Sequence, residues 1–166
     1  CSLQYPFWVR ADTENSNISG GVETVVIPWS SSLELISASA NIYSPEFTNL
    51  ILTTKNSVSG TIYSDLFPQQ NPESSIGDSL SESKLIAVAI TGKRCPPLEP
   101  NCAKELQKPF RIIVATDSDW LSEYMVTNNG YRGHTELGAN WIDWLTQENA
   151  LISIRGKGKS VRLLTF

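Results

Sequence analysis

The 166-residue chain has one histidine, one methionine and three cysteines, and it has no long hydrophobic run. A membrane-spanning helix needs about 20 apolar residues, whereas the longest candidate run covers only residues 85–90. Positive charge is also scarce, because 13 Lys and Arg stand against 17 Asp and Glu and give a net charge of −4. Proteins that bind nucleic acid non-specifically are normally basic. The composition therefore predicts a soluble, mildly acidic globular domain that does not bind nucleic acid.

The single histidine restricts the catalytic options. A serine or cysteine nucleophile needs a neighbouring base, and His134 is the only imidazole in the chain. The sequence also lacks a Gly-x-Ser-x-Gly motif, a P-loop and a Gly-x-Gly-x-x-Gly motif. His134 comes just before a predicted helix, where capping or surface exposure is the commoner role. We therefore predict no catalytic residue and no cofactor.

Two of the three cysteines bracket a proline-rich segment. Cys95 and Cys102 enclose Pro-Pro-Leu-Glu-Pro-Asn, and closing so short a loop with a disulfide stabilises a protein by about 2–3 kcal/mol. A disulfide here implies an oxidising compartment; the alternative is two free thiols in a mobile loop. A four-ligand metal site is hard to build with one histidine, so we predict no metal.

The chain begins without an initiator methionine or a signal peptide. We expect it to be a piece of a longer protein. Cys1 is either the lipid-bearing residue of a bacterial lipoprotein or an arbitrary boundary.

Apolar and β-branched runs predict short strands within a single domain spanning residues 1–166. Long loops are expected near residues 55–83 and 92–109. The predicted strands cover residues 22–27, 50–54, 84–91 and 110–116, with a further short apolar segment at 33–36.

Two helices are predicted after residue 116. The first begins near Trp120, after the N-capping oxygens of Asp117-Ser-Asp119. The second covers about 135–148, because Leu137, Trp141, Trp144 and Leu145 share one helical face. Strands are then predicted at 151–154 and 161–166. This order of strand, helix, helix and strand predicts an α/β layered domain.

Asp117 and Asp119 are the sharpest acidic pair. They lie where a strand ends and a helix begins, a place where ligands collect in open α/β sheets. They could hold a divalent cation, or they could accept N–H bonds from the start of the helix.

Aromatic and basic side chains supply two further candidates. Trp120, Trp141 and Trp144 could form a sugar-binding platform, although their helical spacing favours core packing. Arg155, Lys157 and Lys159 form a small basic patch around a predicted Gly156–Gly158 turn, and it could face anionic lipid headgroups.

Several motifs carry a resemblance to a known family. The first group is Tyr5-Pro-Phe-Trp-Val9, Gly20-Gly-Val-Glu-Thr-Val-Val-Ile-Pro-Trp29 and Ser32-Leu-Glu-Leu35. The second is Arg111-Ile-Ile-Val-Ala-Thr-Asp-Ser-Asp-Trp-Leu121, Gly133-His134, Asn140-Trp-Ile-Asp-Trp-Leu145 and Leu151-Ile-Ser-Ile-Arg155. In this order they resemble the soluble region of gliding-motility type auxiliary components of ABC transporters. The chain departs from that pattern at Ala115-Thr116, where a small residue and Gly are usual, and at His134, where Asn is usual.

The resemblance implies an open, mostly parallel or mixed sheet flanked by helices, similar to flavodoxin and glutamine-amidotransferase domains. It implies a non-enzymatic accessory domain at the extracytoplasmic or periplasmic face of a bacterial membrane. Segments outside this chain would anchor it, and its partners would be the permease and ATPase of the same ABC system. Asp117, Asp119 and His134 are the candidate binding residues. The alternatives are a hydrolase or amidotransferase-like enzyme that uses Asp117 and Asp119, and a carbohydrate-binding module.

Overall fold

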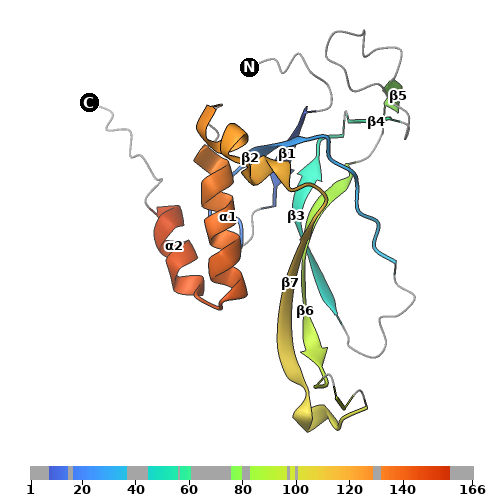
Figure 1. Cartoon of the computed structure of the whole chain (residues 1–166), viewed down its shortest axis with the longest axis vertical. Coiled ribbons are helices and arrows are strands. Elements are labelled where there is room, and N and C mark those ends of the chain that lie inside the picture. The colour runs from blue at the N-terminus through green and yellow to red at the C-terminus, as the bar shows by residue number, and fades with distance from the viewer. Residues whose placement is uncertain are drawn as a thin grey trace.

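The chain is built around a five-stranded antiparallel sheet, as the computed structural model shows (Figure 1). The structure describes residues 8–14, 17–36, 45–55, 57–60, 76–79, 83–96, 98–99, 101–128 and 132–157. Every neighbouring pair of strands in this sheet is antiparallel, and β2 and β7 form its two edges. In spatial order the strands are β2 (Thr24–Pro28), β1 (Trp8–Thr13), β3 (Glu46–Thr53), β6 (Leu85–Arg94) and β7 (Lys108–Ala115).

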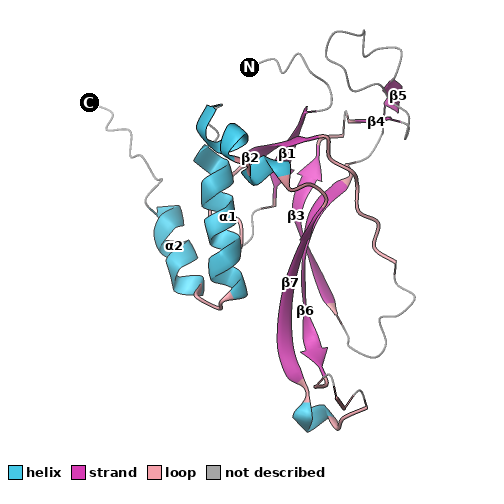
Figure 2. Cartoon of the chain, in the orientation of Figure 1, coloured by secondary structure: helices cyan, strands magenta, loops and turns pink. Residues whose placement is uncertain are grey.

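The remaining elements are short (Figure 2). A separate pair of antiparallel strands is formed by β4 (Val58–Gly60) and β5 (Ile76–Ser79). Both α-helices, α1 (Arg132–Leu145) and α2 (Asn149–Lys157), follow the last strand of the main sheet. The 3₁₀ helices η3 (Lys104–Leu106) and η4 (Asp119–Leu121) and the π-helix η5 (Tyr124–Asn128) complete the described elements.

The predicted fold class is wrong. We expected an open, mostly parallel or mixed α/β sheet of the flavodoxin or glutamine-amidotransferase type, but the strands form an antiparallel sheet with few helices. The physical reason lies in the connection between β6 and β7, in whose described residues the 3₁₀ turn η3 is the one helical element. A parallel pair needs a crossover, usually through an α-helix, whereas an antiparallel pair can be joined by a direct return.

Individual elements agree better with the sequence. The predicted strands at 22–27, 50–54, 84–91 and 110–116 correspond to β2, β3, β6 and β7. The predicted loop at 55–83 contains β4 and β5, and β6 and β7 extend into both ends of the predicted loop at 92–109.

Other predictions differ from the structure or lie outside it. The segment predicted as a strand at 151–154 lies inside α2, so that prediction is wrong. The first predicted helix is replaced by η4 and η5, whereas the second corresponds to α1. Residue 33 makes only an isolated bridge with Leu85. Cys1 and the predicted strand at 161–166 lie outside the described residues.

The hydrophobic core lies between the sheet and the helices. Trp120, Leu137, Trp141 and Trp144 are almost fully buried there. The sheet contributes apolar side chains from four of its strands to the same cluster, namely Ala11, Val25, Ile27, Leu50, Ile51, Ile86, Ala87 and Ala89. The predicted burial of Trp141 and Trp144 is confirmed, but Leu145 at the end of α1 is 41% exposed, so its predicted burial is wrong.

Arg111 connects the edge strand β7 to the end of α1. Its guanidinium lies over the Trp144 ring, 4.9 Å from the ring centroid. The same side chain donates a 2.5 Å hydrogen bond to the Trp144 carbonyl oxygen. This cation–π contact and the hydrogen bond fix the indole against the sheet.

The close approach of α1 to the 17–21 turn depends on Gly20. This residue has φ +62°, and a Cβ atom placed on it would lie 2.9 Å from Asn140 Cγ. The Asn140 amide donates a 3.1 Å hydrogen bond to the Ser19 carbonyl oxygen.

Within the described residues, no helix is long and apolar enough to cross a membrane.

Replacing Trp144 by alanine tests this packing. We expect Trp144→Ala to lower the free energy of unfolding by about 3–5 kcal/mol, the range for deletion of a large buried aromatic side chain. Urea denaturation followed by circular dichroism measures the change. Leu145→Ala, on the exposed side of the same helix end, is the control and should cost far less. Equal stability of Trp144→Ala and the wild type would contradict the assignment of Trp144 to the core.

Candidate functional site

The acidic pair divides between two roles. Asp117 follows β7 and is half-buried, and its Oδ2 accepts a 3.1 Å hydrogen bond from the Trp120 N–H. Asp119 is the first residue of η4 and is exposed. One of the two roles considered for this pair is to accept N–H bonds at the start of the helix, and Asp117 does accept such a bond. Whether either carboxylate also binds a ligand stays a prediction.

His134 lies in the first turn of α1, and its side chain, 1% exposed, faces the edge strand β2. Its Nε2 accepts a 3.0 Å hydrogen bond from the Val26 N–H. The imidazole also packs edge-on against Trp120, with 5.8 Å between the ring centroids. An Nε2 atom that accepts a hydrogen bond carries no proton, so His134 is a neutral imidazole that bridges the helical layer and the sheet. Neither helix capping nor surface exposure, its expected roles, describes this position.

Burial sets the protonation of this imidazole. The loss of solvation lowers the pKa of His134 below its ordinary value of 6.5, and a hydrogen bond with the Trp120 backbone opposes this shift in part. Protonation would also place a second N–H opposite the Val26 N–H, so the existing hydrogen bond favours the neutral form.

Trp120 therefore connects two of the three predicted binding residues. Its backbone bonds to Asp117, and its indole contacts His134. Asp119 is exposed next to it. In the part of the chain that the structure describes, no group of three or more His, Cys, Asp or Glu side chains could hold a metal ion.

The three tryptophans considered as a sugar platform are interior residues. Trp120 and Trp141 are 2% and 7% exposed, and their ring centroids lie 4.9 Å apart. Trp144 is 8% exposed. Rings this deeply buried cannot stack on a sugar, so the favoured interpretation, core packing, is confirmed and the alternative of a sugar platform is wrong for these three residues.

A different group of rings lies at the surface. Trp8 packs edge-to-face against Trp29, with 6.1 Å between centroids, and against Tyr124, with 6.2 Å between centroids. Trp29 is 47% exposed and Tyr124 is 55% exposed. We call Trp8, Trp29 and Tyr124 the aromatic cluster. Sequence reasoning missed it because the three residues come from β1, the turn after β2 and η5, which only the fold brings together.

The backbone of Trp29 supports a specific role for the aromatic cluster. Trp29 has φ +47°, in the left-handed region that bulky residues rarely adopt. Such a conformation is costly, and it is often found where a side chain must point in a functional direction.

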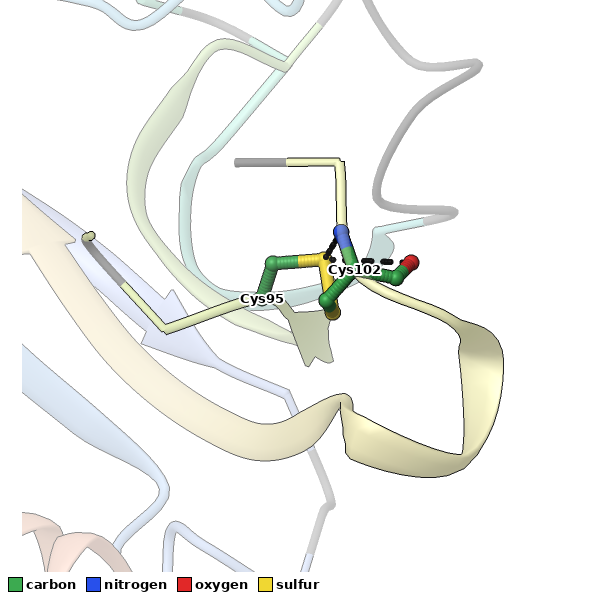
Figure 3. The surroundings of a disulfide bond; sticks show 2 residues. All are labelled: Cys95 and Cys102. Carbon is green, nitrogen blue, oxygen red and sulfur yellow. Dashed lines mark hydrogen bonds between the residues drawn. A yellow bond between two sulfur atoms is a disulfide. The ribbon is translucent and has the colours of Figure 1, made fainter. Parts of the chain in front are cut away.

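The remaining candidates are the cysteines and the basic patch. Cys95 and Cys102 form a disulfide with 5.6 Å between their Cα atoms (Figure 3), so the predicted pairing is confirmed. The Cys102 N–H also donates a 3.1 Å hydrogen bond to Cys95 Sγ. A disulfide of this kind is typical of an oxidising, extracytoplasmic environment. Arg155 and Lys157 lie in α2 rather than around a turn, and Lys159 lies outside the described residues.

Substitution of the two carboxylates separates their roles. We expect Asp117→Ala to lower the free energy of unfolding by about 0.5–2 kcal/mol, because the Trp120 N–H loses its acceptor. Asp119→Ala should change it by less than about 0.5 kcal/mol, as for most exposed positions. Urea denaturation with and without millimolar Mg²⁺ measures both effects. A metal-dependent stabilisation that both substitutions abolish would show instead that the pair binds a cation.

The pH dependence of stability tests the state of His134. The unfolded chain binds the proton more readily than the native chain, so the stabilisation is complete above about pH 6.5 and is lost as the pH falls toward the native pKa. Urea denaturation between about pH 7.5 and 5.5, above the usual range of carboxylate titration, should show this loss. His134→Gln should be less stable than the wild type at the upper pH and should show a flatter pH profile. The same pH dependence in both proteins would contradict this assignment.

Comparisons with known proteins found no relative of this chain. No protein-family model, no curated protein and no solved structure matches the chain. The resemblance to auxiliary components of ABC transporters rests on the motifs quoted from the sequence.

Proposed function

We propose that this chain is a non-enzymatic accessory domain of an ABC-type transport system and that the aromatic cluster contacts its partner. The observation that carries the proposal is the contrast between the two groups of aromatic rings. Trp120, Trp141 and Trp144 are buried, whereas Trp29 and Tyr124 are about half exposed around Trp8.

The chemistry of the aromatic cluster favours a protein partner. Tryptophan and tyrosine are enriched in protein interfaces, where they bury a large area at a small entropic cost. Their arrangement is less suited to a sugar, because a sugar stacks on a flat ring face. Trp8 and Trp29 meet at an interplanar angle of 89°, and Trp8 and Tyr124 at 75°, so neighbouring rings do not form a common plane.

The identity of the partner follows from the resemblance. Trp8 and Trp29 lie within the first group of motifs that resembles the auxiliary components. The permease and ATPase of the same ABC system are therefore the proposed partners, and the permease is the one accessible from outside the cytoplasm. The disulfide supports an oxidising location, which we specify as the extracytoplasmic face of a bacterial membrane, with the anchor in segments outside this chain.

The enzyme alternative has less support. Asp117 is engaged with the Trp120 N–H, and His134 Nε2 is engaged with the Val26 N–H. A general base must have a lone pair available to the substrate. The bond from Val26 uses the only acceptor lone pair of the neutral His134 imidazole, whereas one hydrogen bond leaves lone pairs on the Asp117 carboxylate. The half-buried Asp117 and the exposed Asp119 carboxylates are therefore the features that favour this alternative.

Co-purification with the transporter tests the proposed function. The protein, in its full natural length, is expressed with the permease and ATPase of an ABC system from the same organism and is captured by an affinity tag on the permease. We expect Trp29→Ala and Tyr124→Ala each to reduce the recovered protein by roughly 5- to 30-fold, the effect of an interface residue that contributes about 1–2 kcal/mol.

A matched variant controls for the loss of an exposed apolar side chain. Ile154 is 64% exposed, comparable to Tyr124, and it lies in α2, outside the aromatic cluster. Ile154→Ala should therefore be recovered like the wild type, and thermal melting should show that all variants are folded. Equal recovery of the aromatic variants and the wild type would rule out the aromatic cluster as the contact. Binding of glycan instead of permease, lost in the same variants, would favour the carbohydrate-binding alternative.

A further inference from the structure

The β6–β7 hairpin, with β3 paired to β6 as far as Thr91, forms an arm that extends beyond α1 and α2 (Figure 1). Its two strands stay paired from Ala87 and Ala115 to Arg94 and Lys108. The described residues of the segment 93–108, which we call the hairpin tip, lie at the far end of the molecule from β1 and β2 (Figure 1).

Apolar side chains protrude from the hairpin tip. Leu98 is 95% exposed, the highest exposure among the large exposed hydrophobic side chains of the described residues, and Leu106 is 55% exposed. Exposed apolar side chains on a projecting loop are a candidate contact surface where a second feature accompanies them.

Cationic side chains accompany these leucines. Four exposed cations lie in the hairpin tip, namely Lys93, Arg94, Lys104 and Lys108, and they stand against the two acids Glu99 and Glu105. Four positive charges less two negative charges give the hairpin tip a net charge of +2, although the whole chain has a net charge of −4. The end of the arm therefore carries a local excess of positive charge, unlike the chain as a whole.

The disulfide holds this loop in place. Cys95 and Cys102 close the part of the loop that contains Leu98. η3, with its 3.2 Å hydrogen bond from the Gln107 N–H to the Lys104 carbonyl oxygen, orders the part that contains Leu106. A contact surface that is ordered before binding loses less conformational entropy when it binds.

We propose that the hairpin tip docks the domain onto an anionic lipid bilayer. Leu98 and Leu106 would enter the boundary between headgroups and acyl chains, and the four cations would face the lipid phosphates. Insertion of apolar side chains combined with attraction of Lys and Arg to anionic lipids is the general basis of interfacial membrane binding. A soft bilayer suits a projecting apolar side chain such as Leu98, because the side chain can be surrounded by lipid without a preformed pocket.

Vesicle sedimentation with the full, oxidised chain tests this proposal. One set of vesicles contains equal parts of phosphatidylglycerol and phosphatidylcholine, and the other contains only phosphatidylcholine. We expect binding to the anionic vesicles to be on the order of tenfold stronger and to weaken as the salt concentration rises. Binding to neither set, or equal binding to both, would overturn the proposal.

Two matched pairs of variants locate the contact. Leu98→Glu should reduce binding about tenfold or more because it replaces an inserting side chain by a charge, whereas Ile36→Glu, at a residue that is 81% exposed outside the hairpin tip, should bind like the wild type. Lys104→Glu should weaken binding, and Lys55→Glu, which makes the same charge change at another exposed position, should weaken it much less.

The outcome with these variants decides the proposal. Undiminished binding of Leu98→Glu, or an equal loss in the two lysine variants, would overturn it. Because Leu98 is almost fully exposed, its substitution should leave the melting temperature unchanged. The test is independent of the proposed function, which depends on the aromatic cluster, so either can fail while the other holds.

Discussion

The hydrogen bond from the Val26 N–H to His134 Nε2 joins the helical layer to the sheet. An edge strand presents N–H groups that no neighbouring strand accepts, and here an imidazole of α1 accepts one of them. The same ring packs against Trp120, whose N–H is bound by Asp117. The edge of β2, the segment after β7 and α1 are thereby held together through buried groups. Since a buried polar group without a partner costs more than a satisfied one gains, this chain of contacts fixes where α1 can lie.

The sequence patterns predict four of the five strands of the sheet, but they miss β1 and the direction of the strands. The apolar runs at 84–91 and 110–116 predict strands buried on both faces. β6 has such a buried stretch, whereas β7 is an edge strand on which Ile112 and Val114 are exposed. Such an apolar run has the same pattern in a parallel and in an antiparallel sheet, so the choice depended on the connection. The predicted disulfide, which favours a direct return between β6 and β7, could have indicated the antiparallel arrangement. At 151–154 the apolar pattern suggests a strand, whereas in the structure Ile152 alone of these residues is buried and the segment is helical.

The candidate site was predictable where it depended on local chemistry. The N–H bond of Asp117 follows from an acidic residue three positions before Trp120, and the disulfide follows from two cysteines that enclose prolines. The aromatic cluster and the buried state of His134 depend on contacts between distant segments. Val26 and His134 are 108 residues apart, and without an alignment or a correct sheet topology no sequence pattern brings them together. Leu145 shows the same limit within one helix. Its spacing places it with the buried residues of α1, but Trp144 is 8% exposed whereas Leu145 is 41% exposed.

The distribution of exposed side chains follows from this architecture. The tryptophans of η4 and α1 pack on the sheet in the core, and this core cluster includes no residue of the hairpin tip. The outer part of the β6–β7 arm is therefore not stabilised by packing against the helices. The ladder between β6 and β7 and the Cys95–Cys102 disulfide maintain the arm beyond the helical layer. A hairpin supported in this way can place apolar and cationic groups far from β1 and β2, where Trp8 and Trp29 lie. The two proposed surfaces therefore lie far apart on the molecule, and contact at one does not block the other.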